Sequence, residues 1–216
     1  MIILTTKWPI KWELRTSMTH PLQISWIKHP QFSGRIGLTL CPGKYQPVSW
    51  SGGWNRDLNT DIAAIVEEDV STIISLVDQR EIEVLRVPEL GKVIVESGIK
   101  WCHLPFRDTT APNKKWLEMF KQIEYDLIDS LRLGGSIVVH CKGGLSRAGT
   151  FIALLLHRFG IKMDACVSMI RTARSESCIN QNQLNFLNSY SADDENSDFN
   201  YPRPMNSNFI SKKVKQ

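Results

Sequence analysis

One stretch decides how this sequence folds, residues 137–147, which reads Ile137-Val138-Val139-His140-Cys141-Lys142-Gly143-Gly144-Leu145-Ser146-Arg147. Its first three residues are apolar and β-branched, which is typical of a short buried strand. The apolar run of residues 148–159 follows and predicts a buried helix that stops at Gly160. The stretch therefore joins a strand to a helix through a loop that runs from Cys141 to Arg147.

This loop has the composition of a phosphate-binding site. Successive backbone N–H groups of such a loop can point inward, and the helix that follows directs its positive end at the same point. Glycine permits the backbone angles and the close approach to a ligand that this requires. The residues expected to bind phosphate are Lys142, Gly143, Gly144, Leu145, Ser146 and Arg147.

Two residues of the loop predict nucleophilic chemistry on the bound phosphate. Cys141 lies at its base, where inward amides, the helix end and Arg147 favour the thiolate over the thiol. Arg147 can hold two phosphate oxygens with its planar guanidinium and keep that contact in the transition state. His140 directly precedes the nucleophile, and we expect it to fix the loop by hydrogen bonding.

Helix and strand patterns alternate on both sides of the loop. Residues 36–40, 72–77 and 99–104 read as short buried strands, and a long amphipathic helix begins near Pro112. This order predicts an α/β fold with a central, mostly parallel sheet flanked by helices. Ligands are expected beyond the carboxyl ends of its strands.

A leaving alkoxide or phenoxide needs a proton, and Asp108 is the residue expected to donate it. Asp108 lies in the loop after the strand at residues 99–104. Parallel topology brings that loop to the same end of the sheet as Cys141. The sequence therefore predicts Cys141, Arg147 and Asp108 as the catalytic residues.

The chain is expected to contain one α/β domain over residues 31–190, with residues 1–30 packed on it. Residues 191–216 are polar and basic, which predicts a flexible tail. No window is long and apolar enough for a membrane span, and the start of the chain does not fit a signal peptide. Five widely spaced cysteines without a CxxC pair indicate reduced thiols and a cytoplasmic protein. A formal net charge of +4 does not indicate nucleic-acid binding.

The sequence resembles the cysteine phosphatases with the HCxxxxxR signature, and within them the kinase-associated group of dual-specificity phosphatases. The resemblance covers about residues 34–190 and is carried by Gly37-Leu38 with Cys41-Pro42-Gly43, residues 83–90, residues 101–112 and residues 140–147. It implies the cysteine phosphatase fold and a two-step reaction: a phosphocysteine forms at Cys141 with Asp108 as acid, and water then hydrolyses it with Asp108 as base. It implies phosphorylated protein as substrate, phosphotyrosine first, with phosphoserine and phosphothreonine left open. It implies neither a metal nor another cofactor, and it suggests that Gln183 orients the attacking water.

The sequence departs from the resemblance in two places. Many members of the family carry Ser or Thr directly after the arginine, to stabilise the departing cysteine thiolate, and here that position is Ala148. Either Ser146 or Thr150 compensates for the missing hydroxyl, or breakdown of the phosphoenzyme is slow; the sequence leaves both open. The acid loop reads Phe106-Arg107-Asp108 in place of Trp-Pro-Asp, which favours the smaller dual-specificity type over the classical tyrosine phosphatases.

Other functions stay open beside this one. The same fold could bind a phosphorylated partner without turning it over. Lys142 beside the nucleophile is compatible with a phosphoinositide, and the 5′ end of RNA is a further substrate class. A redox or metal site at Cys141 is the weakest alternative, since it gives the spacing to Arg147 no purpose.

Overall fold

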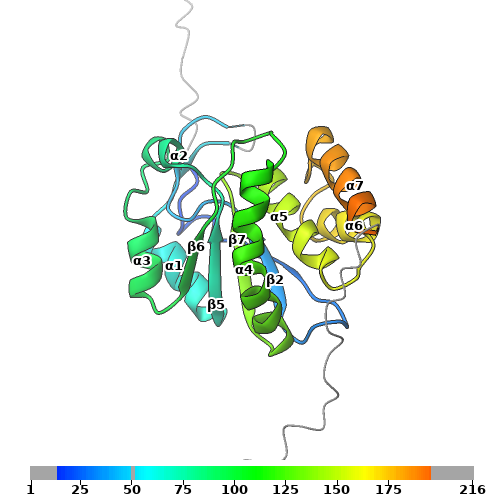
Figure 1. Ribbon diagram of the computed structural model, residues 1–216. Coiled ribbons are helices and arrows are strands. Elements are labelled where there is room, and N and C mark those ends of the chain that lie inside the picture. The colour runs from blue at the N-terminus through cyan, green and yellow to red at the C-terminus, as the bar shows by residue number, and fades with distance from the viewer. Residues whose placement is uncertain (1–13, 50–51, 196–216) are drawn as a thin grey trace, which may run out of the picture.

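Five strands form the central sheet of the computed structural model, which describes residues 14–49 and 52–195 (Figure 1). In the order in which they lie across the sheet, they are β1 (Ser25–Ile27), β2 (Arg35–Thr39), β7 (Ser136–His140), β5 (Val70–Ser75) and β6 (Lys100–His103). β2, β7, β5 and β6 pair in parallel, while β1 pairs antiparallel with β2 at one edge. The predicted α/β fold with a mostly parallel sheet is thus confirmed.

The parallel strands end level with one another. Thr39 and Ser75 are both paired with His140, and Ser75 is also paired with His103. The loops that leave β2, β5, β6 and β7 consequently start side by side at the carboxyl edge of the sheet. This edge is where an open α/β sheet binds its ligands.

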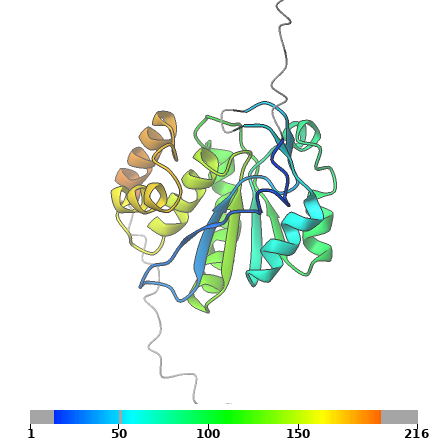
Figure 2. The same ribbon diagram turned by 180° about the vertical axis from the view of Figure 1, so that it is seen from behind.

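The described part of the chain contains seven helices, and those that pack on the sheet cover both of its faces. The seven helices are α1 (Leu58–Glu67), α2 (Gln79–Val84), α3 (Leu90–Glu96), α4 (Lys114–Arg132), α5 (Ser146–His157), α6 (Met163–Ala173) and α7 (Gln181–Glu195). α1 and α3 lie on one face, whereas α4 and α5 pack on the other, with α6 and α7 against α5. Figure 1 looks onto the side of α4, and Figure 2 onto the side of α1.

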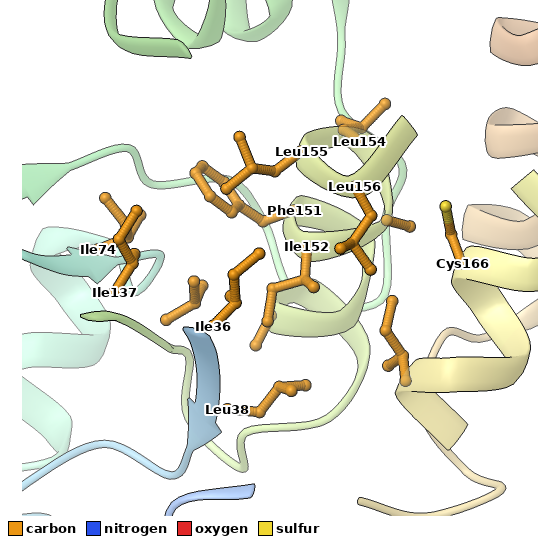
Figure 3. Close-up of a cluster of buried hydrophobic side chains, with 14 of the residues drawn as sticks. Ile36, Leu38, Ile74, Ile137, Phe151, Ile152, Leu154, Leu155, Leu156 and Cys166 are labelled. Atoms are coloured by element: carbon orange, nitrogen blue, oxygen red, sulfur yellow. The ribbon is translucent and has the colours of Figure 1, made fainter. Parts of the chain in front are cut away.

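α5 lies at the centre of the larger hydrophobic core. Every side chain from Arg147 to Leu156 is buried, which explains why this helix is apolar all round instead of amphipathic. Figure 3 shows Phe151 and Ile152 of α5 against Ile36 of β2 and Ile137 of β7. This packing fixes the start of α5, and with it the end of the loop that follows β7.

The structure adds elements that the sequence patterns did not predict. β1 lies within residues 1–30, for which only packing on the domain was predicted, and the short pair β3 (Tyr45–Gln46) and β4 (Trp54–Asn55) lies between the strands expected at residues 36–40 and 72–77. α2 begins directly after β5 and is only six residues long, too short to show a helical period.

The ends of the chain are described in part. Residues 14–30 include β1 and an isolated bridge from Arg15 to Trp54, so this part of the N-terminal segment contacts the sheet domain. α7 continues to Glu195, and residues 1–13 and 196–216 of the two predicted terminal segments lie outside the described residues. Within residues 14–49 and 52–195, no helix combines the length and apolarity needed to cross a membrane.

Candidate active site

A pocket of about 300 Å³ lies at the carboxyl edge of the sheet. Four segments contribute to it: the turn after β2, the β3 region, the loop after β6 and the loop after β7. Its lining residues are Lys44, Gln46, Ser49, Asp108, Cys141, Lys142, Gly143, Leu145 and Ser146. The structure therefore brings together the predicted nucleophile and the predicted acid, which are 33 positions apart in the sequence.

The loop from Cys141 to Arg147 is packed tightly on the end of β2. Gly144 has a φ of 67°, and a Cβ at this position would lie 2.3 Å from the carbonyl oxygen of Thr39. A Cβ at Gly143 would meet open space, since the nearest atom, in the side chain of Leu145, would lie 3.9 Å from it. α5 begins at Ser146, and its N-cap residue Leu145 offers no side-chain acceptor, so the first amides of the helix are available to an anion.

His140 is fixed by a chain of hydrogen bonds that runs through the sheet. Nε1 of Trp101 donates to Oγ of Ser75 at 2.8 Å, and Ser75 Oγ lies 2.6 Å from Nε2 of His140. Since a carbonyl can only accept, Nδ1 of His140 donates to the carbonyl of Cys141 at 3.4 Å, and Nε2 of the neutral ring then accepts from Ser75. Burial lowers the pKa of His140 to about 4, so the ring is neutral. This geometry supports the structural role predicted for His140.

Arg147 is fully buried and is held by a carboxylate that the motif did not reveal. Its Nη1 and Nη2 donate to the two oxygens of Glu81 at 2.6 and 2.7 Å, and Nη1 also donates to the carbonyls of Leu76 and Phe106. Burial by itself lowers the pKa of this guanidinium, but the hydrogen bonds to Glu81 and the charges of Cys141, Asp108 and Glu81 together raise it. Arg147 therefore stays charged in a dry environment.

Glu81 is itself positioned by the start of α2. It forms a capping box with Asp78, in which each side chain accepts a hydrogen bond from the other residue's backbone N–H. The signal in the sequence was the place of Glu81 just after β5, at the same sheet edge as the loop of Cys141. A carboxylate at that edge is a candidate partner for any buried arginine there.

The remaining donor of Arg147 faces the acid. Nε of Arg147 is the one buried side-chain nitrogen or oxygen in the described residues that has no hydrogen-bond partner. Oδ1 of Asp108 lies 3.2 Å away, within ion-pair distance but outside hydrogen-bond geometry. The Asp108 side chain is 44% exposed. An unmet N–H beside the pocket is the feature expected of a phosphate donor.

The other predicted residues lie around this centre. Ser146 lines the pocket together with Cys141, whereas Thr150 is buried, donates to the carbonyl of Ser146 and does not line the pocket. Ala148 is buried in α5. Gln183 is also buried and does not line the pocket: its amide donates to the carbonyl of Thr110 in the Asp108 loop and accepts from the backbone of Asn180. Its predicted role in orienting water stays a prediction.

The other cysteines differ from Cys141 in their surroundings. All five are free thiols. Burial raises the pKa of Cys166 to about 12 and that of Cys178 to about 11, and it raises the pKa of Cys41 further. These thiols stay protonated at neutral pH, and of the five cysteines only Cys141 lines the pocket.

The segment that carries this site is similar to a known family of proteins. Residues 53–161, slightly more than half of the chain, match the family model for the DSP-PTPase phosphatase of polymorphic toxin systems. This stretch contains β4 through the end of α5, and so includes Glu81, Asp108 and the loop of Cys141.

Individual relatives agree with that match. PRL-1 phosphatase of Drosophila melanogaster is 36% identical over 97 residues, which cover 43% of this chain and 52% of the relative. Protein tyrosine phosphatase type IVA B of Dictyostelium discoideum is 31% identical over 99 residues, with 44% and 58% covered. The chain thus spans about half the length of these relatives. A crystal structure of kinase-associated phosphatase, with its catalytic cysteine replaced by serine, shares the fold at a TM-score of 0.71 and 22% identity, covering 80% of this chain and 96% of that one.

Proposed function

Because this chain belongs to the family of DSP-PTPase phosphatases, we propose that it hydrolyses phosphate monoesters of proteins through a phosphocysteine at Cys141. Phosphotyrosine is the first substrate class, and phosphoserine and phosphothreonine are further ones. The names of the relatives, a PRL-1 phosphatase and a protein tyrosine phosphatase, support this choice.

The observation that carries the proposal is a pocket lined by two of the three predicted catalytic residues, with the third buried beside it. Cys141 and Asp108 line it, and the unmet Nε–H of Arg147 lies 3.2 Å from Asp108. A nucleophile, an acid and a charged donor are the parts that phosphoryl transfer to cysteine requires. The first amides of α5 add further donors for the phosphate oxygens.

The proposed reaction has two steps. The thiolate of Cys141 attacks phosphorus, a P–S bond forms, and the P–O bond to the leaving group breaks while Asp108 gives its proton to the leaving oxygen. Water then attacks the phosphocysteine, Asp108 takes a proton from it, and the P–S bond breaks to return the thiolate and release phosphate. Arg147 stays bound to the phosphoryl oxygens through both steps, held in place by Glu81.

We also propose the bounds of the catalytic domain and its cellular location. The catalytic domain comprises residues 31–190, which is supported by the hydrophobic core that residues from β2 to α7 share, with Ile27 of β1 packed into it. The protein works in the cytoplasm, which is supported by its five free thiols, since the nucleophile must stay reduced. No metal or cofactor takes part in the steps above.

A direct assay tests the proposal. Purified protein is given p-nitrophenyl phosphate, a phosphotyrosine peptide, a phosphothreonine peptide, a phosphoinositide and a 5′-triphosphorylated RNA. We expect turnover of the first two that is lost in Cys141→Ser. Binding of phosphopeptide without cysteine-dependent release of phosphate would instead identify a phosphoprotein-binding module, and preferred turnover of the lipid or RNA would identify another substrate class.

A further inference from the structure

A lysine outside the motif lies in the wall of the pocket. Lys44 follows β2, its residue is 3% exposed, and it lines the same pocket as Cys141. Its Nζ donates to Oε1 of Gln46 and to the carbonyl of Lys142, both at 3.2 Å. These acceptors are neutral, and no carboxylate of the described residues lies within ion-pair distance of Lys44. Nζ also lies 5.2 Å from the centroid of the Trp54 ring. The thiolate proposed for Cys141 is the one anion of the described residues in the same pocket that acts on Lys44, and a buried ammonium is costly without opposite charge, so Lys44 points to an anion that the pocket receives.

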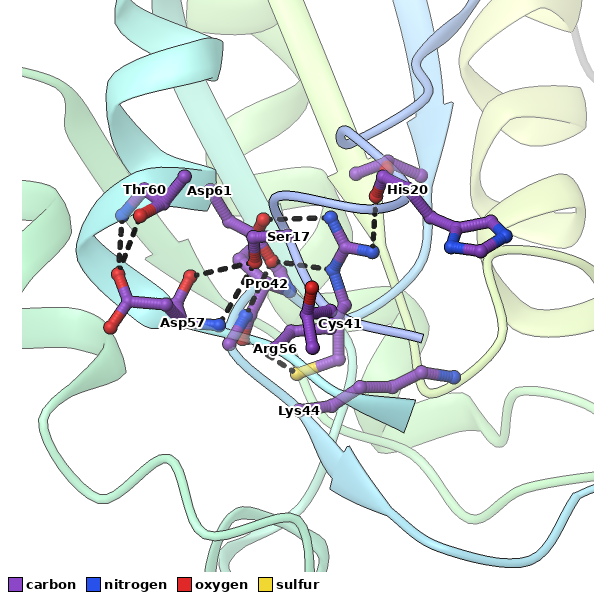
Figure 4. A network of polar contacts seen from close by, with 12 residues as sticks. Ser17, His20, Cys41, Pro42, Lys44, Arg56, Asp57, Thr60 and Asp61 are labelled. Atoms are coloured by element: carbon purple, nitrogen blue, oxygen red, sulfur yellow. Dashed lines mark hydrogen bonds and ion pairs between the residues drawn. The ribbon is translucent and has the colours of Figure 1, made fainter. Parts of the chain in front are cut away.

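The fold holds this lysine rigidly. Arg56 and Asp61 form a buried ion pair with two contacts of 2.7 and 2.8 Å, and Oδ2 of Asp61 accepts from the backbone N–H of Gly43. The backbone carbonyl of Lys44 in turn accepts from the N–H of Arg56. Figure 4 shows this network and the side chain of Lys44 extending away from it. The backbone of Gly43 and Lys44 is thus held by Asp61 and Arg56, while the Lys44 side chain lines the pocket.

A second cation lies next to Lys44. Lys142 is half-buried, lines the same pocket and forms no ion pair with the described residues. Burial, together with the charges of Lys142 and Arg56, lowers the pKa of Lys44 to about 8, against the opposing effect of Cys41 and Cys141. The two lysines therefore repel one another until an anion lies between them.

The reacting phosphate can draw on donors other than these two lysines. The guanidinium of Arg147 is held by Glu81 and keeps Nε without a hydrogen-bond partner, and the start of α5 lies at the same loop. Asp108 is the one carboxylate that lines the pocket. Among the described residues it forms an ion pair with Arg147 and none with Lys44 or Lys142. A pocket of about 300 Å³ is also larger than a single phosphate group.

We propose that Lys44 and Lys142 form a subsite for a second anionic group of the substrate, a carboxylate or phosphate beside the phosphate that Cys141 attacks. This inference rests on the proposed function and names the substrate class that the site prefers. Gln46 and Ser49, which line the pocket next to Lys44, add neutral hydrogen-bonding groups to the subsite.

The test compares two substrates of equal shape, 3-carboxyphenyl phosphate and 3-carbamoylphenyl phosphate. We expect wild type to prefer the carboxylate by about tenfold in kcat/KM, the size of one charge-assisted hydrogen bond. Lys44→Met should reduce the preference to about twofold or less, and Lys142→Met should reduce it independently. Lys121→Met, on the exposed side of α4, is the matched control and should keep it.

Two further pairs identify where the second anion comes from. One pair is a phosphotyrosine peptide with Glu or Gln beside the phosphotyrosine, and the other is an inositol bisphosphate and monophosphate. If wild type prefers the more negatively charged member of one pair and Lys44→Met loses that preference, that pair identifies the source of the second anion. Equal preference in wild type and Lys44→Met, with both proteins folded by thermal melting, overturns the subsite.

The result also separates the two proposals. Turnover that requires Cys141 but shows no charge preference removes the subsite alone. Absence of cysteine-dependent turnover of every substrate removes the proposed function and the subsite with it. If Lys44→Met does not fold, Lys142→Met and the charge-preserving Lys44→Arg decide the question.

Discussion

Oδ1 of Asp108 lies 3.2 Å from Nε of Arg147, at ion-pair distance from the donor that we expect to bind a phosphate oxygen. In the proposed mechanism the acid and the substrate therefore compete for the same guanidinium group. When a phosphate binds, Asp108 must give up this contact, and its carboxyl then lies beside a dianion instead of a guanidinium. Once released from Arg147, the carboxyl is free to act on the leaving oxygen, which is the role proposed for it.

Replacing Asp108 with Asn should separate binding from turnover. Asp108→Asn removes the charge that competes for Arg147, so inorganic phosphate should inhibit about threefold more strongly, as for loss of a partly exposed ion pair. Hydrolysis of phenyl phosphate should fall by about 10² to 10⁴, the usual contribution of a general acid, and that of p-nitrophenyl phosphate much less. Steady-state kinetics on both substrates measure this. Equal slowing would remove Asp108 from the acid role.

Glu81 should matter for stability and for catalysis through Arg147. Glu81→Gln keeps the shape of the side chain but loses one charged acceptor, which should cost about 2 kcal/mol of the free energy of unfolding. A less firmly held guanidinium should lower kcat/KM by about tenfold. Urea denaturation and kinetics measure both effects, with Glu83→Gln on the exposed side of α2 as control. Identical behaviour of the two variants would mean that Glu81 does not hold Arg147.

The two loop glycines should respond differently to a methyl group. At Gly144 the φ of 67° and the 2.3 Å approach to Thr39 oppose any side chain, so Gly144→Ala should lower the free energy of unfolding by about 1–3 kcal/mol. At Gly143 a Cβ meets open space, so Gly143→Ala should change stability by less than about 1 kcal/mol. Thermal and urea unfolding compare them. A stable Gly144→Ala would contradict the tight packing of the loop on β2.

The neutral His140 predicts a loss of stability in mild acid. Its folded pKa of about 4 lies below the unfolded value, so the unfolded state takes up a proton first as the pH falls. The contribution is fully present above about pH 6.5 and declines toward pH 4. Between pH 7.5 and 5 the wild type should lose about 2 kcal/mol more than His140→Gln. Urea denaturation at both pH values measures the difference, and parallel pH curves for the two proteins would show that His140 is not buried in its neutral form.

The fold and the centre of the site could be predicted from the sequence because their signals are local. The strand before Cys141 and the helix after Arg147 follow one another directly, and both are buried on all sides, so a short run of residues shows them. Asp108 followed from topology, since the loop after β6 had to reach the same edge.

The partners of these residues were not predictable from local patterns. Glu81 lies 66 positions before Arg147, and Lys44 lies 98 positions before Lys142. Their contacts depend on the register that aligns Thr39, Ser75 and His140 at one edge, which no short pattern reveals. The helix α2, which carries Glu81, was not predicted because six residues are too few to show a helical period. The water-orienting role of Gln183 was inferred from a resemblance, which does not specify the contacts of this side chain.

The most direct test of the central claim is to trap the covalent intermediate. Protein is mixed with p-nitrophenyl phosphate, quenched in acid within milliseconds and digested, and the peptide that contains Cys141 is examined by mass spectrometry. We predict one phosphoryl group on the sulfur of Cys141, absent in Cys141→Ser. Steady hydrolysis without a phosphopeptide, or a phosphoryl group on another residue, would contradict the account.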